Sequence, residues 1–155
     1  MEHRERCSDQ PPPLLVRGIH EFNEREFFDC HETLEVLWRG EPHPVRYLYQ
    51  GILHVGVGYY HLGRGNYHGA TTKLRTGCEL LDFYVPRCQG VEVAPLIDAA
   101  RRSIERLQEL GAGRLGEFEA GLIPTIELVG PRPAAHAGPL PPLPSSKASA
   151  GGASV

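Results

Sequence analysis

The sequence contains no uninterrupted apolar run that is long enough to cross a membrane. Glycine, histidine and arginine repeatedly interrupt its most apolar part, residues 47–67, whereas a transmembrane helix needs about 20 mostly apolar residues in a row. The first residues also lack the basic and then apolar layout of a secretory signal. These absences argue against a membrane protein and against export, so we expect a cytoplasmic protein.

Basic charge is not in excess either. The chain has 155 residues and a net charge of −3, and no half of it is clearly basic. Nucleic-acid-binding domains usually carry a basic patch or stripe, so we expect no nucleic-acid partner. The composition leaves open a protein partner or a homo-oligomer.

Cysteine is scarce, and its spacing excludes two common kinds of site. The four cysteines include no C-x-x-C pair, which argues against a structural zinc knuckle and a thioredoxin-type motif. Without an export signal, disulfide bonds are not expected. Cys30 and Cys78 fall within apolar helical patterns, where a free cysteine usually acts as a small hydrophobic residue.

Large apolar residues are rare at both ends of the chain. Residues 131–155 are dominated by proline, alanine, glycine and serine, and residues 1–13 are polar with a final run of prolines. Such segments bury too little apolar surface to offset the entropy that ordering costs. We therefore predict disordered segments at 1–13 and 131–155 around one helical domain at 14–130, which is long enough for its own core.

What the sequence does contain is helical periodicity, and nothing alternates with the period of two that is typical of strands. Apolar residues recur at spacings of three and four in stretches near residues 15–22, 27–38, 45–62, 67–81 and 96–107. Short connections with glycine or proline separate these stretches, so successive helices should run antiparallel. The pattern predicts an all-α fold: a compact bundle of about five helices built from antiparallel helical hairpins.

The most unusual motif is CHETLEVLW, in which HETLE matches the zinc-hydrolase pattern H-E-x-x-H except for its last residue. His31 and Glu35 share one helix face, and an antiparallel neighbouring helix brings Gln50 and His54 close to them. One hypothesis is a hydrolase-like site for zinc, manganese or iron, with His31, Glu35 and His54 as ligands. In that hypothesis, Glu32 deprotonates a metal-bound water.

The second hypothesis is a polar pocket that fixes the fold or binds a ligand. A buried carboxylate and a buried imidazole must find partners, because an unpaired buried charge is costly. The residues that we assign to this pocket lie on facing sides of the second and third predicted helices: His31, Glu35, Trp38, Gln50, His54 and His61.

Two longer segments resemble a known family. FNEREFFDCHETLEVLW (22–38) and YQGILHVGVGYYHLGRGNYHGA (49–70) are similar to the domain of unknown function 309 family. The resemblance implies a compact all-α bundle and implies no activity. Family members typically carry His and Glu where this chain has His31 and Glu35, but often Gln where it has His54. That difference favours the shared polar pocket over a metal site.

Two classes of function remain. The first is a small enzyme or ligand binder that uses the His/Glu cluster, and the second is an interaction protein whose polar core only fixes the fold. Burial separates the two classes. A cluster that opens to a pocket reachable by solvent favours the first, and a closed cluster favours the second.

Overall fold

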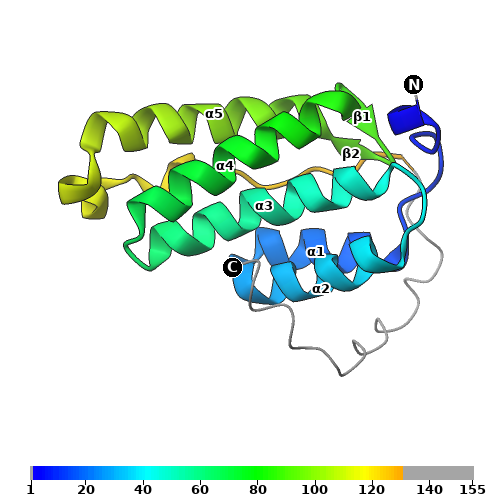
Figure 1. The fold of residues 1–155 in the computed structure, drawn as a ribbon, viewed down its shortest axis with the longest axis horizontal. Coiled ribbons are helices and arrows are strands. Elements are labelled where there is room, and N and C mark those ends of the chain that lie inside the picture. Colours follow the sequence, from blue (N-terminus) through cyan, green and yellow to red (C-terminus); the bar gives the residue numbers. More distant parts are fainter. Residues whose placement is uncertain (1, 131–155) are drawn as a thin grey trace.

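The computed structural model describes residues 2–130, and Figure 1 shows them as a bundle of helices. Its α-helices are, in chain order, α1 (Pro13–Asn23), α2 (Phe27–Gly40), α3 (Arg46–Gly63), α4 (Tyr67–Leu81) and α5 (Val93–Leu110). The prediction of an all-α bundle is confirmed. The predicted disordered tail, residues 131–155, lies outside the described residues.

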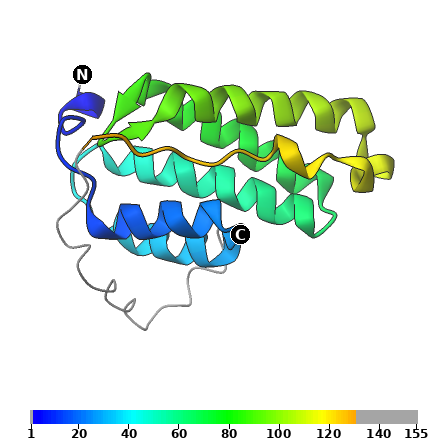
Figure 2. The same cartoon turned by 180° about the vertical axis from the view of Figure 1, so that it is seen from behind.

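Consecutive helices pack against each other in chain order, from α1 on α2 to α4 on α5. Figure 1 and Figure 2 show the long helices side by side along one common direction. α3 lies between α2 and α4 and makes its most extensive contact with α4, which places the most apolar helix at the centre of the bundle. Within residues 2–130, no helix has both the length and the apolar character of a membrane span. The expected cytoplasmic location stays a prediction.

Two glycines of α3 mark close approaches of α4. A Cβ atom at Gly58 would lie 2.7 Å from Cγ of Leu74, and one at Gly51 would lie 2.8 Å from Cγ of Leu81. Packed side chains do not come so close, so a larger residue would push the two helices apart. The close crossing explains why residues with poor helix propensity stand in a central helix.

Large side chains from all the α-helices fill the core. The largest fully buried ones are Leu15, Phe22, Leu34, Leu48, Tyr49, Ile52, Tyr59, Leu74, Leu81, Tyr84, Leu96 and Leu107. Two of the tyrosine hydroxyls find partners inside the protein: Tyr49 donates to Oε1 of Gln89 at 2.7 Å, and Tyr59 shares a hydrogen bond of 2.8 Å with Ser103. These bonds avoid the cost of burying an unpaired hydroxyl.

A short hairpin between α4 and α5 holds the start of the chain. Its strands are β1 (Arg87–Cys88) and β2 (Val91–Glu92), which pair antiparallel. Cys88 forms a disulfide bond with Cys7, and the backbone N–H of Gln89 donates to the Cys7 carbonyl oxygen at 2.7 Å. The hairpin thus anchors a segment that is remote in sequence.

The structure corrects two expectations about this region. Residues 2–13 are placed against the bundle: they begin with a short 3-10 helix, η1 (Glu2–Arg4), and Arg4 donates to the Val85 carbonyl oxygen at 2.9 Å. The cysteines are not all reduced, because two of them form the disulfide. Both features depend on contacts between distant positions, which periodicity cannot reveal. Cys30 and Cys78 are buried free thiols, as predicted.

After α5 the chain passes through two short 3-10 helices, η3 (Ala112–Glu117) and η4 (Ala120–Leu122), and then returns along the bundle in extended form, as Figure 2 shows. Asn23 at the end of α1 anchors the return. Its side-chain amide donates to the Ile126 carbonyl oxygen at 3.0 Å, and its Oδ1 accepts from the Ile126 N–H at 2.7 Å. The returning segment runs from the end of the bundle where α2 begins to the β1–β2 hairpin, where the Val129 N–H donates to the Gly90 carbonyl oxygen.

Candidate functional site

The HETLE motif forms a chain of ionic contacts along α2. Nε2 of His31 lies 3.1 Å from Oε1 of Glu35, and Oε2 of Glu35 accepts a hydrogen bond of 2.6 Å from Nη2 of Arg39. The spacing of four residues places the three side chains on one helix face. His31 is 2% exposed and the Glu35 side chain 12%, so their contact is largely shielded from water. We refer to these residues as the His31–Glu35–Arg39 chain.

Burial favours the neutral form of two histidines in this region. It lowers the pKa of His31, and the negative charge of Glu35 opposes that shift. Burial also lowers the pKa of His54 to about 4, and the positive charge of Lys73 and the nearby His31 add to the effect. A neutral His31 can still donate its Nε2 proton to Glu35.

The structure gives two of the predicted pocket residues other partners. Nδ1 of His61 lies 3.3 Å from Nδ2 of Asn66, at the turn between α3 and α4. Trp38 lies under the guanidinium of Arg46, whose central carbon is 4.7 Å from the centre of the indole ring. Gln50 is half-buried on α3, and its place in the pocket stays a prediction.

The described residues do not assemble the predicted metal centre. Within residues 2–130, no group of three or more histidine, cysteine, aspartate or glutamate side chains is placed to hold a metal ion. His31 and Arg39 engage the two oxygens of Glu35, and the assignment of His31, Glu35 and His54 as metal ligands stays a prediction. Glu32, the predicted base, is exposed and lies off the face that His31 and Glu35 share.

Sequence reasoning missed two cations near these residues. Arg39 follows Glu35 at the spacing typical of helical ion pairs, so spacing alone could have found it. Lys73 comes from α4, and only the packing of the helices brings its charge close to His31 and His54. Because His31 is buried and both oxygens of Glu35 are engaged, the His31–Glu35 part of this polar cluster is largely closed to solvent, whereas Arg39 is exposed and His54 is half-buried.

A cavity of about 660 Å³ lies at the end of the bundle where α2 begins and α3 ends. Three segments that are distant in sequence supply its apolar lining: Phe27, Phe28, Tyr59, Tyr60, Leu62, Leu115, Phe118, Ala120 and Ile123. Its charged lining consists of Arg25, Glu26, Asp29 and Arg64. We name this cavity the aromatic groove. Neither His31 nor Glu35 lines it.

The floor of the aromatic groove is buried, whereas its mouth is exposed. Phe27 is 9% exposed, and its ring centre lies 5.2 Å from that of Phe22 and 5.8 Å from that of Tyr59. Phe28 is 43% exposed, although its ring centre lies 5.8 Å from that of Tyr60. An exposed phenylalanine beside an apolar cavity is a surface that a binding partner could cover.

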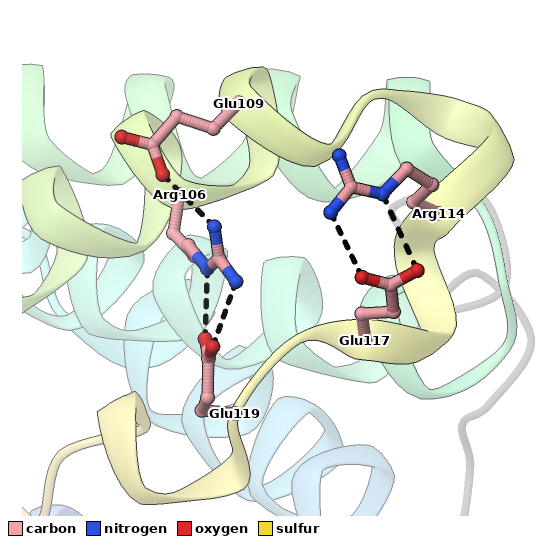
Figure 3. Close-up of polar contacts among 5 residues, drawn as sticks. All are labelled: Arg106, Glu109, Arg114, Glu117 and Glu119. Atoms are coloured by element: carbon pink, nitrogen blue, oxygen red, sulfur yellow. Dashed lines mark hydrogen bonds and ion pairs between the residues drawn. The ribbon is translucent and has the colours of Figure 1, made fainter.

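Ion pairs hold the wall of the groove that follows α5, as Figure 3 shows. Nε and Nη2 of Arg106 donate to the two carboxylate oxygens of Glu119 at 2.9 and 2.8 Å. Nη1 of Arg106 donates to Glu109 at 3.0 Å, and Arg114 pairs with Glu117 at 2.9 Å. The hydrogen bonds from Arg106 lower the pKa of Glu119. The segment that these pairs hold supplies apolar side chains to the groove.

Arg25 joins this wall to the loop before α2. Its backbone has a φ of +67°, in the left-handed region. Its Nη1 donates to the Pro124 carbonyl oxygen at 2.7 Å, and its Nη2 donates to the Ile123 carbonyl oxygen at 2.8 Å. The unusual backbone angle thus accompanies a contact that closes one side of the groove.

The first turn of α2 lines the groove and has backbone N–H groups that the helix itself does not use. Phe27, Phe28 and Asp29 form the first turn of α2 and line the cavity. Glu26, at the N-cap, makes no capping hydrogen bond through its side chain. The first amides of a helix have no acceptor within the helix, so they can bind a carbonyl oxygen in the groove.

Together these features define a class: a small helical domain with a buried His–Glu pair in α2 and an aromatic groove at one end. Residues 15–72 match the family model described as Domain of unknown function (DUF309). This segment is therefore similar to the family that its motifs indicated. The match spans most of α1, all of α2 and α3, and the first turn of α4, so it includes the His31–Glu35–Arg39 chain.

The chain is also similar to the Uncharacterized protein YpuF of Bacillus subtilis (strain 168), with 30% identity over 120 residues. The aligned part covers 76% of this chain and 59% of that protein. The chain thus spans less than two thirds of the length of this curated relative. No solved structure matches the chain significantly. The comparisons show a similarity to this family over residues 15–72 and name no reaction or ligand.

Proposed function

We propose that this domain is a binding module that takes up an extended polypeptide segment in its aromatic groove. In this proposal, the His31–Glu35–Arg39 chain fixes the fold. The observation that carries the proposal is the separation of the two features. The exposed aromatic surface lies in the groove at Phe28, whereas His31 is buried and Glu35 is largely buried outside the groove lining.

The groove is suited to binding more than to catalysis. Tyr59 contributes to its floor, but burial raises the pKa of this tyrosine to about 12, and its hydroxyl is hydrogen-bonded to Ser103. A general acid or base works best when its pKa is close to the working pH. Tyr59 is therefore better explained as part of the packed floor.

The chemistry of the groove suits an extended peptide. The apolar floor offers a surface for side chains, the first-turn amides of α2 offer donors for backbone carbonyls, and the charged residues at the edge offer contacts for flanking side chains. Its volume lies within the range of about 300–1,000 Å³ that is usual for ligand pockets. Aromatic-lined grooves recur among domains that bind extended segments.

The polar cluster around His31 and Glu35 supports the same proposal, because it can determine how the helices pack. A buried polar pair can specify one packing arrangement over others. We assign this role to His31 and Glu35, with His54 and Gln50 of α3 as further members of the cluster. Their task is to set how α2 packs on α3, and hence where the first turn of α2 lies in the groove.

Binding to an array of short peptides with varied apolar, aromatic and proline content tests the proposal. The full chain is compared with Phe28→Ser and with Phe83→Ser. Phe83 is a matched control, because it is 51% exposed and its ring stacks on His3, outside the groove lining. We expect the wild type and Phe83→Ser to retain the same peptides and Phe28→Ser to lose them. Retention of no peptide, or equal retention by both variants, contradicts the proposal.

A further inference from the structure

We propose that the aromatic groove binds a segment of this same chain, Pro139–Pro144, whose sequence is PLPPLP. This inference rests on the proposed function of the groove and names its occupant. The segment lies outside the described residues. Its composition, its flanking charge and its position along the chain support the assignment.

The composition of the segment matches an aromatic floor. Proline-rich sequences favour the polyproline II helix, which has three residues per turn. In that geometry Leu140 and Leu143 share one face, and the prolines form the other two faces. Such helices dock in grooves lined by aromatic side chains, because their rigid shape loses little entropy on binding.

The hydrogen-bonding chemistry also matches. Proline has a backbone carbonyl but no N–H, so most of the backbone polar groups of PLPPLP are acceptors. The first turn of α2 supplies donors at Phe27, Phe28 and Asp29, without a capping side chain to occupy them. A proline-rich segment can therefore enter the groove and leave few of its own donors unpaired.

The charged side chains at the groove include two partners for a basic segment, Glu26 and Asp29. Residues 131–155 contain Arg132 and Lys147, which flank the proline-rich segment, and no aspartate or glutamate. Glu26 and Asp29 are exposed at the edge of the groove. The two arginines of the lining have other contacts, one with backbone carbonyls and one with a tyrosine ring. The basic tail can thus pair with Glu26 and Asp29, although Arg25 and Arg64 balance the charge of the lining.

The length of the chain allows the segment to reach the groove of its own molecule. The described structure ends at Gly130, next to Val129, whose N–H donates to the Gly90 carbonyl oxygen beside the β1–β2 hairpin. Figure 1 shows this hairpin at the opposite end of the bundle from the α3–α4 turn. α3 has 18 residues and is about 27 Å long at 1.5 Å per residue. The nine residues from Gly130 to Pro139 span about 28 Å at 3.1 Å per residue.

Occupation by its own tail makes the groove a site for which partners must compete. A short flexible tether gives an effective concentration of at most about 1 mM, and a lower one when it must be extended to span the distance. If the free segment binds with a Kd of about 0.1 mM, a competing peptide binds the intact chain up to about tenfold more weakly than a chain with a disabled tail. The tail therefore sets an affinity threshold for external partners.

The test compares amide chemical shifts of the full chain with those of two variants. The first combines Leu140→Ser and Leu143→Ser and removes the shared apolar face. The second combines Ala134→Ser and Ala135→Ser and serves as a control in the same tail. We expect the leucine variant to change the shifts of groove residues such as Phe28 and Tyr60, and the control to leave them unchanged. A peptide of residues 136–147 should then bind the leucine variant more tightly than the wild type, by up to about tenfold.

The possible failures are distinguishable. Unchanged groove shifts in the leucine variant overturn this inference, whereas the peptide array decides the proposed function separately. Shift differences that grow with protein concentration assign the groove to the tail of a second copy and overturn the intramolecular arrangement. Shift changes of equal size in the alanine control also overturn the inference, because binding would then not depend on Leu140 and Leu143.

Discussion

The ring of Phe28 lies 5.8 Å from that of Tyr60 in the aromatic groove and 5.9 Å from that of His31 in the polar cluster. One residue of α2 therefore contacts both features. The contact of His31 with Glu35 is largely buried, and the first turn of the same helix carries the exposed aromatic side chain. This relationship connects the HETLE motif to binding without giving the motif a catalytic role.

Glu35→Gln should lower the free energy of unfolding by about 1–2 kcal/mol. Hydrogen bonds to charged groups contribute roughly 1.5–3 kcal/mol, and the glutamine oxygen can still accept from Arg39. Urea denaturation measures the change. The control is Glu32→Gln, because Glu32 is exposed on the same helix and should change stability by less than about 0.5 kcal/mol. Equal effects of the two substitutions would show that the His31–Glu35–Arg39 chain does not fix the fold.

The free energy of unfolding should fall as the pH drops from the ordinary histidine pKa of 6.5 toward the pKa of about 4 that His54 has in the folded protein. Between these values the unfolded chain carries a proton on His54 and the folded protein does not, so acid favours unfolding. Lys73 and His31 also lower the pKa of His54, so they act in the same direction as burial. Unfolding measured across this pH range should depend less on pH in His54→Gln, and should be unaltered in His20→Gln, which changes an exposed histidine. Parallel curves for the wild type and His54→Gln would contradict a buried, neutral His54.

Gly58→Leu should cost about 1–3 kcal/mol or more, because even its Cβ atom would meet Leu74 at 2.7 Å. Thermal and urea unfolding measure the loss. Gly40→Ala is the control, since a Cβ atom there has no neighbour within 4 Å and should be tolerated. A Gly58→Leu protein as stable as the wild type would mean that α3 and α4 can separate without loss.

Much of the fold follows from local patterns, because burial along a helix repeats with the helical period. The pairing of Gly58 with a residue of α4 is an example: a glycine in an apolar helix indicates a close crossing. The Cys7–Cys88 bond could not be found in this way. It joins positions separated by 81 residues, and neither cysteine lies in a periodic stretch.

For the candidate sites, too, the sequence predicts contacts within one helix but not contacts between distant segments. The contact of His31 with Glu35 follows from their spacing on one helix. The aromatic groove does not follow from spacing, because Leu115 and Phe118 reach it on a returning segment without periodicity. The contacts of Arg25 that join this wall to the loop before α2 depend on a positive φ at a non-glycine residue, which sequence patterns rarely indicate.

Arg106→Gln should loosen the wall of the groove with little effect on the melting temperature. The ion pair with Glu119 is exposed, and such pairs contribute little to global stability. Loss of this ion pair should speed amide hydrogen exchange at Leu115 and Phe118, because local opening no longer has to break the two hydrogen bonds between Arg106 and Glu119. Arg101→Gln changes an exposed arginine of the same helix and should leave the exchange rates unchanged. Identical exchange in the two variants would mean that the ion pair does not hold the wall.

The most direct test of the binding role is chemical-shift mapping with the tightest peptide that the array retains. Titration into the wild type and into Phe83→Ser should shift Phe28, Tyr60, Leu115 and Phe118, which line the groove, and titration into Phe28→Ser should produce no such shifts. A peptide that instead shifts residues around His31, Glu35 and His54, or that binds Phe28→Ser as tightly as the wild type, would contradict the assignment of binding to the aromatic groove.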